Sequence, residues 1–231
     1  MPIYQVVITG VGIALLVITA AGLLVRRRAA FCRFFCADLL ASAMSALLVV
    51  LWPSRFYNFT FYTVKETVLN PLDIAVALEV WRRSFSCFPK ARRDVGVLLL
   101  GALVVTAIAT WTIPGDLHPY DALVCVLIPR LHAGTISLFA ILAAAAKWYG
   151  VPLHPLHRAI LAGGAAALSV DVLLLSFLGW QSGSEGVRSV ASSLHSVTYV
   201  GVAAWWTWAA WRPLRAPMPI VSRLQPWAHT W

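Results

Sequence analysis

The chain has 231 residues, of which 60% are hydrophobic and only 12% are charged, and its formal net charge is +9. This composition excludes an ordinary soluble domain and a disordered chain, because both carry a larger share of polar and charged residues. At about 20 apolar residues per span, a chain of 231 residues has room for about seven membrane spans and for no extramembrane domain beyond small loops.

Apolar runs predict seven transmembrane helices, which form one all-α bundle and occupy residues 1–231 as a single domain. The expected helices cover residues 3–25, 34–52, 60–81, 95–113, 121–146, 159–180 and 189–211. The first run has no basic segment before it and stops at Arg26, Arg27 and Arg28, which predicts a retained helix rather than a cleaved signal peptide.

Lysines and arginines are distributed unevenly between the two sets of helix ends. Fourteen of the 18 fall at one set, whereas only Arg55 and Arg188 fall at the other. Because basic loops near spans are retained in the cytoplasm, the N-terminus is expected outside and the C-terminus inside a bacterial cytoplasmic membrane. The positive charge then faces anionic lipid of the inner leaflet, and no nucleic-acid partner is expected.

Tryptophans mark the predicted helix ends, as interface anchors do. They are Trp52, Trp81, Trp111, Trp148, Trp180 and Trp211. The cytoplasmic end of the last helix carries three further tryptophans, Trp205, Trp206 and Trp208. We expect them to belong to a lipid-facing belt. An aromatic surface for a partner helix or a pigment is the alternative.

The four cysteines do not form a disulfide framework. Cys32 and Cys36 stand four residues apart near the cytoplasmic side, and Cys87 lies in a cytoplasmic loop, so all three face a reducing compartment. Packing residues or a lipidation site are favoured over a metal site, because no further ligand stands near Cys32 and Cys36.

Polar residues inside the spans are the candidate site residues, because an unpaired charge there costs about 2.5–3.5 kcal/mol. In the third helix Tyr62, Glu66, Asn70 and Asp73 share one face. The later helices contribute Arg130 with Gly134 and Ser137, Asp171 with Gly163 and Ala167, and His195 with Tyr199.

Four of these residues, Glu66, Arg130, Asp171 and His195, are expected about 9–14 Å from the outer helix ends, in one layer of the bundle. One interpretation is a structural ion network in which Arg130 pairs with Glu66 or Asp171. A second is a ligand pocket open to the outside, and a third is a proton path through Asp171, His195 and the polar face of the third helix.

Asp38, Ser42 and Ser45 form another polar face, on the second helix. If Asp38 faces Asp73 near the midplane, the two carboxylates would share a proton or bind sodium, although a helix contact through the hydroxyls is the commoner use of such a face. His154 and His157 lack a third ligand for zinc. Only His132 and His195 lie deep enough in the spans to bind haem, and they allow one axial ligand rather than a matched pair. No metal and no cofactor are therefore expected.

Residues 60–83 open with Thr-Phe-Tyr-Thr-Val-Lys-Glu-Thr-Val and close with Glu-Val-Trp-Arg-Arg, ahead of a basic loop and an apolar span. Together with Arg130, Asp171 and the arginine that ends the last helix, this layout resembles small uncharacterised bacterial seven-helix membrane proteins. The resemblance implies a seven-helix fold and no particular activity.

The sequence carries no His-Glu-x-x-His, no Gly-x-Ser-x-Gly and no glycine-rich phosphate loop, so we expect a protein that is not an enzyme. Three functions agree with the pattern: a sensor or receptor-like module, an accessory subunit of a membrane complex, and a proton- or ion-coupled carrier of small solutes. Apart from the lipid bilayer, the partners that the pattern allows are another membrane protein, a second copy of the chain, and a small ligand from the outer side.

Overall fold

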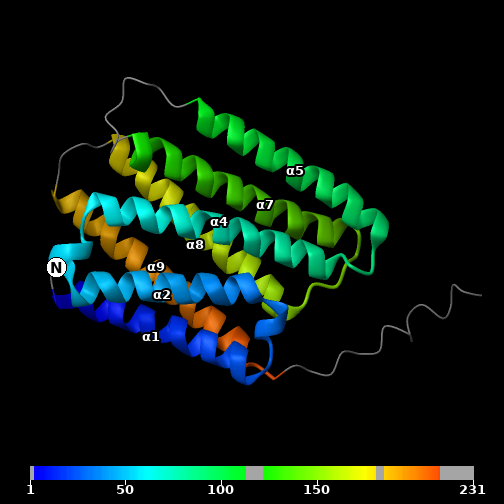
Figure 1. Cartoon of the computed structure of the whole chain (residues 1–231), viewed down its shortest axis with the longest axis horizontal. Helices are drawn as coiled ribbons and strands as arrows, with labels where there is room; N and C mark the ends of the chain where they lie inside the picture. Colours follow the sequence, from blue (N-terminus) through cyan, green and yellow to red (C-terminus); the bar gives the residue numbers. More distant parts are fainter. Residues whose placement is uncertain (1–2, 113–121, 181–184, 214–231) are drawn as a thin grey trace, which may run out of the picture.

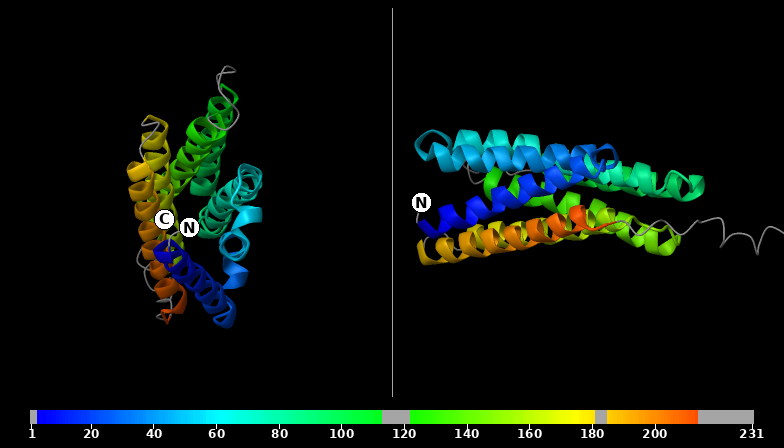
Figure 2. Two further views of the ribbon diagram at one scale, coloured as in Figure 1. Left: turned by 90° about the vertical axis from the view of Figure 1, so that its left-hand side faces the viewer. Right: turned by 90° about the horizontal axis from the view of Figure 1, so that it is seen from below.

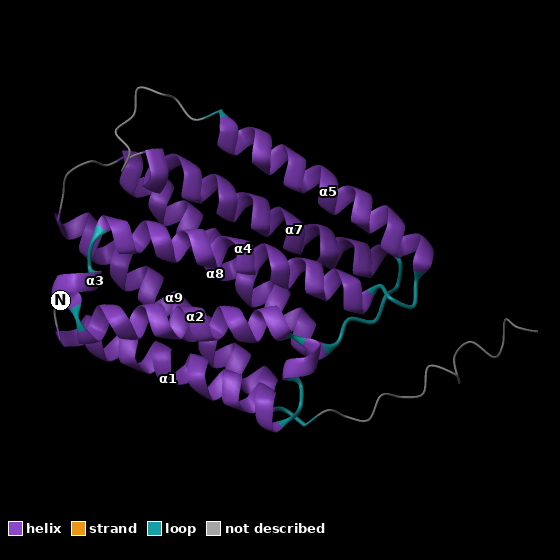
Figure 3. Cartoon of the chain, in the orientation of Figure 1, coloured by secondary structure: helices purple, strands orange, loops and turns teal. Residues whose placement is uncertain are grey.

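The computed structural model describes residues 3–112, 122–180 and 185–213, and these residues form helices joined by short loops, without a strand (Figure 3). The predicted all-α fold is confirmed. The α-helices are α1 (Ile3–Val25), α2 (Arg33–Leu51), α3 (Pro53–Phe56), α4 (Phe59–Ser84), α5 (Pro89–Trp111), α7 (Ile128–Trp148), α8 (Pro155–Trp180) and α9 (Glu185–Trp211). A 3-10 turn, η1 (Ala29–Phe31), precedes α2, and a π-helical segment, η2 (Ala122–Leu127), leads into α7.

Seven of these helices coincide with the seven predicted ranges to within a few residues, and the single turn α3 was not predicted. The predicted range 121–146 corresponds to the π-helical segment η2 followed by α7, and the largest remaining difference is at α5, which begins at Pro89 rather than at residue 95. Proline is well suited to the first turn of a helix. The helix therefore starts in the basic segment, ahead of the apolar run by which its start was predicted.

Length and composition bear out five of the seven predicted membrane spans. Among the described residues, five helices are long and apolar enough to cross a membrane: Tyr4–Val25, Arg33–Leu51, Pro89–Trp111, Ala122–Trp148 and Pro155–Ser176. Helix α4 falls short because it carries charged side chains along its length, such as Lys65, Glu66 and Asp73. Helix α9 falls short because its serine, threonine, histidine and tryptophan residues lower its mean hydropathy.

Six helices close into a ring in the order α1, α2, α4, α7, α8 and α9, with α9 packed back against α1. Figure 2 (left) looks along this arrangement from one end. Helix α5 lies outside the ring, where it packs mainly on α7 and only sparsely on α4, at the edge of the molecule opposite α1 (Figure 1). The inner face of the ring is therefore formed by helices from both ends of the chain.

Two apolar clusters hold the bundle together. The first joins α1, α2, α8, α9 and one residue of α4 around Leu16, Leu39 and Ala203, and the second joins α4, α5, α7 and α8 around Val80, Leu99 and Leu142. Helix α8 contributes to both clusters, so it ties the two halves of the bundle into one unit.

Basic side chains gather at one end of the bundle. The loops after α1, α4 and α7 and the last turn of α9 all lie at this end (Figure 1, right). It carries Arg26, Arg27, Arg28, Arg33, Arg82, Arg83, Lys90, Arg92, Arg93, Lys147, Arg158 and Arg212. We refer to it as the arginine-rich end.

At the arginine-rich end, the side chains of Arg28 and Glu79 form hydrogen bonds with backbone groups at helix ends. Arg28 is buried and donates to the carbonyl oxygens of Ala209, Ala210 and Arg212 at 3.2, 3.0 and 2.8 Å, which caps the C-terminus of α9. Glu79 of α4 accepts from the backbone N–H groups of Arg33 and Phe34, both at 3.0 Å, at the start of α2. Both contacts supply partners to backbone groups that a helix end leaves unpaired.

The tryptophans near the end of α9 and the cysteine before α2 differ in whether their side chains are exposed or buried. Trp205 and Trp208 are exposed, in agreement with a belt, but Trp206 is buried and donates from Nε1 to the carbonyl of Ala159 at 2.9 Å. Its inclusion among the lipid-facing residues is therefore corrected. Cys32 is buried beside α2, and burial raises the pKa of its thiol to about 12, so it is a packing residue with little thiolate at neutral pH.

Candidate functional site

The first polar cluster inside the ring joins α4 to α7. Glu66 of α4 is buried, and its carboxylate lies 2.8 Å from Lys65 Nζ and 3.8 Å from Nε2 of His132 on α7. Asn70, one turn further along α4, donates from Nδ2 to the Glu66 carbonyl at 2.8 Å and to its carboxylate at 3.3 Å. A carboxylate at a helix interface is thus surrounded by an ammonium, an imidazole and an amide.

The second polar cluster joins α8 to α9. Asp171 Oδ1 lies 2.5 Å from Nδ1 of His195, and the His195 ring stacks on Tyr199 with centroids 6.2 Å apart. The helices can approach closely because Gly163, two turns before Asp171, has Val202 and Trp206 of α9 against its backbone. Small residues allow such approach of membrane helices, and here they bring an acid and an imidazole together.

A third group of polar residues lies deeper, near the middle of the helices. Asp73 is close enough to Asp38, Glu66 and Asp171 for the charges of these carboxylates to interact. Tyr199 of α9 stacks on the His195 ring and is close enough to Asp38, Asp73 and Asp171 for their charges to act on its hydroxyl. Side chains from α2, α4, α8 and α9 therefore converge on the interior of the ring, together with His132 from α7.

Arg130 is not part of this group, which corrects the predicted pairing with Glu66 or Asp171. Its guanidinium donates to the carbonyl oxygen of Ala109 at 2.5 Å and lies 3.3 Å from that of Thr112, both near the C-terminal end of α5. Within the described part of the chain, Arg130 forms no ion pair. The last carbonyls of a helix lack backbone donors and carry its negative pole, so they satisfy a cation without a carboxylate.

His132 takes the role beside Glu66 that the sequence had assigned to Arg130. The two residues stand two positions apart on α7 and so face different directions. The sequence indicates His132 only as one of two histidines deep enough to bind haem, and not as a partner of Glu66. The spacing of His132 from Ile128 and Thr135, which are buried with it, could have indicated that it lies on the inward face.

Two buried polar atoms of the first cluster have no hydrogen-bond partner among the described residues: Oδ1 of Asn70 and Nδ1 of His132. The two side chains are only 4% and 6% exposed. A buried polar group without a partner costs about 1–3 kcal/mol, and natural proteins usually satisfy it with a water molecule or a ligand. These atoms therefore indicate where an additional hydrogen-bonding molecule would be stabilised.

The second cluster is accessible. The side chains of His195 and Asp171 are 49% and 22% exposed, and both are close enough to charged side chains of α4 for their charges to interact. Counting about 1.5 Å per residue from the helix ends opposite the arginine-rich end, Glu66, His132, Asp171 and His195 lie about 10–15 Å along the bundle, and Asp38, Asp73 and Tyr199 about 20 Å. The polar region thus extends from the third of the bundle opposite the arginine-rich end to its middle.

Towards the arginine-rich end the ring is filled by apolar side chains. Phe35, Val76, Ile160 and Trp206 belong to one buried cluster, and the ring of Phe35 meets that of Trp206 edge to face at 5.1 Å. The polar side chains therefore give way to apolar ones toward the arginine-rich end, and we refer to Phe35, Val76, Ile160 and Trp206 as the apolar plug.

Three or more histidine, cysteine or acidic side chains that could hold a metal do not come together in the described ranges. A sodium ion or a shared proton between Asp38 and Asp73 stays a prediction. We refer to Glu66, Asn70, His132, Asp171, His195, Asp38, Asp73 and Tyr199 as the interior site.

No protein-family model, no curated protein and no solved structure matches the chain. The resemblance of residues 60–83 to small bacterial membrane proteins therefore stays a prediction, and the function must be argued from the interior site.

Proposed function

We propose that the chain is a non-enzymatic, seven-span protein of a bacterial cytoplasmic membrane, and that the interior site binds a small ligand from the outer side as the input of a sensor or receptor-like module. The carrying observation is the pair of buried, unpartnered atoms in Asn70 and His132, which lie in a polar region that stops at an apolar plug. A site that opens on one side of the membrane and is closed toward the other is suited to binding a ligand and less suited to transporting it.

Helices α4 and α9 count as spans in this proposal despite their composition. Glu66 and Asn70 of α4 are buried, and Glu66, Asp73 and His195 face partners inside the ring. Val64 and Val68 of α4 and Val197 of α9 are exposed instead. Charged residues in membrane helices are tolerated when they face the bundle interior or a water-filled cavity.

Charge and hydrogen-bonding capacity suggest which ligand fits. The interior site holds four carboxylates, those of Asp38, Glu66, Asp73 and Asp171, and the one lysine beside them is Lys65. The Asn70 oxygen is an acceptor, and so is Nδ1 of a neutral His132 that donates from Nε2. A small organic cation with N–H donors complements both the charge and the acceptors.

A proton- or ion-coupled carrier is the second candidate, favoured by the contacts of Glu66 with His132 and of Asp171 with His195, since acids and imidazoles inside membrane spans line the proton paths of pumps and transporters. It requires the apolar plug around Phe35 and Trp206 to open toward the arginine-rich end. An accessory subunit would instead use the exposed Trp205 and Trp208 against a partner helix. A sensor also needs a partner protein for its output, and the basic cytoplasmic loops are the surface available for it.

The proposed orientation is tested with reporter fusions. A reporter that is active only in the cytoplasm should work after Phe88, in the loop between α4 and α5, and after Arg212, whereas a periplasmic reporter should work within residues 114–120. The expectation follows from the gathering of arginines and lysines at one end of the bundle. A periplasmic C-terminus would overturn the orientation.

Ligand binding is tested by the thermal stability of the purified protein in mild detergent. Methylammonium and ethanolammonium should raise the melting temperature, whereas acetate and ethylene glycol should not. A ligand at about 100 times its Kd stabilises by about 2.7 kcal/mol, which for a chain of this size corresponds to a shift of about 5–10 °C. Asp171→Asn should remove the shift.

The matched control is Asp94→Asn, which removes a carboxylate bonded to the Tyr149 hydroxyl at 2.9 Å, outside the interior site. This variant should keep the full response to the cations. Equal responses of both variants, or stabilisation by acetate, would contradict a cation site at Asp171. A pH-dependent uptake of the cation into vesicles would favour the carrier over the sensor.

A further inference from the structure

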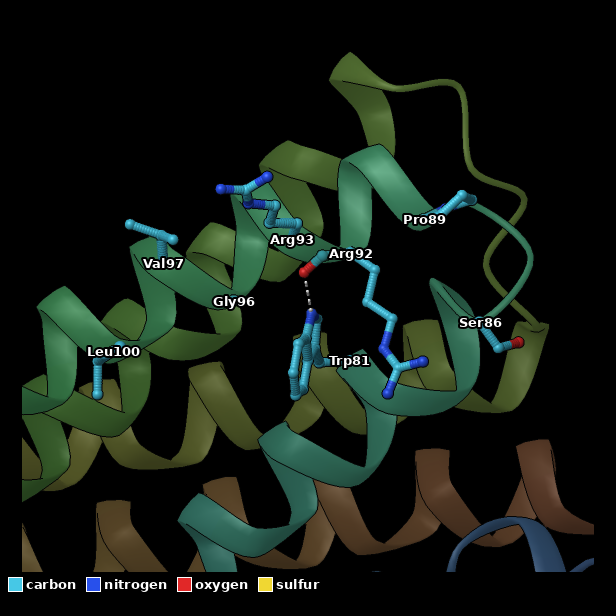
Figure 4. Close-up of a pocket in the computed structure, with 8 residues that line it drawn as sticks. All are labelled: Trp81, Ser86, Pro89, Arg92, Arg93, Gly96, Val97 and Leu100. Atoms are coloured by element: carbon cyan, nitrogen blue, oxygen red, sulfur yellow. Dashed lines mark hydrogen bonds between the residues drawn. The ribbon is translucent and has the colours of Figure 1, made fainter.

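A groove separates the end of α4 from the start of α5 at the arginine-rich end of the bundle. It has a volume of about 510 Å³, and its lining includes Trp81, Arg92, Arg93, Gly96, Val97 and Leu100 (Figure 4). It belongs to neither the interior site nor the apolar plug.

Trp81 forms the floor of the groove. Its indole nitrogen donates to the carbonyl of Arg92 at 3.1 Å, which joins α4 to α5, and the dashed line in Figure 4 marks this bond. A Cβ atom at Gly96 would come within 2.9 Å of the Trp81 ring, so glycine allows the indole to lie directly against the backbone of α5. The floor is therefore a defined packing arrangement that holds the two helices at this spacing.

Positive charge lies along one side of the groove without a carboxylate partner. Arg92 stacks over the Trp81 ring at 5.6 Å, and Arg93 is exposed. Among the described residues, neither arginine forms an ion pair. The adjacent Asp94 is bonded to the Tyr149 hydroxyl. Two guanidinium groups are thus available for an anion from outside the chain.

Further along α5, beyond Arg93, the lining of the groove is apolar (Figure 4). Val97 and Leu100 are 65% and 63% exposed, and α5 is one of the five helices apolar enough to cross a membrane. A molecule that fits both parts of the groove has an anionic phosphate at one end and a hydrocarbon chain at the other. A free phosphate would use the arginines and leave the apolar wall uncovered.

We propose that this groove binds an anionic phospholipid, with the phosphodiester held by Arg92 and Arg93 and an acyl chain lying along Val97 and Leu100. Basic pockets between membrane helices on the cytoplasmic side hold anionic headgroups in this manner. The site rests on the membrane placement of α5 and on the inward orientation of the arginine-rich end, and it is independent of any ligand in the interior site.

The test is native mass spectrometry of the purified full chain in detergent with dioleoyl phosphatidylglycerol, and with dioleoyl phosphatidylcholine as the zwitterionic comparison. The unaltered protein should retain phosphatidylglycerol in preference to phosphatidylcholine. Each basic residue near an anionic lipid contributes a factor of about five in affinity, so Arg93→Gln should weaken retention about fivefold and Arg92→Gln with Arg93→Gln about 25-fold. Arg93→Lys should keep most of it.

Arg26→Gln with Arg27→Gln is the matched control, because it removes two exposed charges from the same end of the bundle but outside the groove. This variant should retain the lipid as the unaltered protein does, whereas equal loss in both double variants would overturn the proposal in favour of unspecific attraction. Displacement of the lipid by excess sodium phosphate would overturn it in favour of a plain anion site. Melting temperatures of all variants show that they are folded.

Discussion

Replacing Gly163 with leucine should destabilise the bundle more than any other single change in α8. A Cβ atom at this position would collide with the Trp206 indole and lie 3.1 Å from Val202. Trp206 cannot move aside, because it is bonded to Ala159 and packed on Phe35. Overpacking of a close core contact costs about 1–3 kcal/mol or more, and leucine adds several atoms beyond Cβ. We expect the melting temperature in mild detergent to fall by about 6–12 °C.

Gly201→Leu on α9 is the control, since nothing lies within 4 Å of its Cβ position. It should leave the melting temperature within about 2 °C of the unaltered protein, as surface substitutions do. Similar melting temperatures for the Gly163 and Gly201 variants would show that α8 and α9 do not pack through Gly163.

Arg28→Ala should produce the second large effect, through the C-terminus of α9. Three carbonyl acceptors at Ala209, Ala210 and Arg212 lose a charged donor. Hydrogen bonds to charged groups are worth about 1.5–3 kcal/mol each in net terms, and partial rehydration at the membrane surface offsets part of the loss. We expect a total cost of about 2–4 kcal/mol, measured as a melting temperature lowered by about 5–12 °C.

Arg26→Ala removes an exposed arginine of the same loop and serves as its control. The fall in melting temperature should be confined to the Arg28 variant and should be reduced in Arg28→Lys, which keeps one donor to the α9 carbonyls. If Arg26→Ala lowers the melting temperature as much as Arg28→Ala, the effect belongs to the charge of the loop and not to the cap.

Helix positions were predictable from the sequence because the spacing of apolar runs and turn residues is a local property. The range 3–25 coincides with α1, and the others differ by a few residues. The composition of the helices does not determine their order around the ring. The contact of α9 with α1 joins opposite ends of the chain, and no short-range pattern encodes it.

The interior site was predictable residue by residue but not as pairs. A helical period of 3.6 places Glu66 with Asn70 and Asp171 with Gly163 on one face, and it says nothing about which neighbouring helix that face meets. The pairing of Asp171 with His195 follows from the α8–α9 contact. The pairing of Glu66 with His132 needs the rotation of α7, which the sequence left open.

Arg130 shows why charge alone is a poor guide to a partner. The sequence favoured a carboxylate because an isolated guanidinium is costly in a membrane. The structure satisfies it with the Ala109 and Thr112 carbonyls at the end of α5, and backbone acceptors cannot be recognised from residue type.

The central claim, an interior site open only to the outer side, is tested most directly by cysteine accessibility in intact cells. In a variant with all four native cysteines replaced, His195→Cys should react with a membrane-impermeant methanethiosulfonate added outside. Val197→Cys on the lipid-facing side of α9 should stay unmodified, because a thiol ionises poorly in lipid. Ile160→Cys in the apolar plug should react from neither side in intact cells and inverted vesicles. An unreactive residue at position 195, or one that reacts only from the cytoplasmic side, would contradict the account.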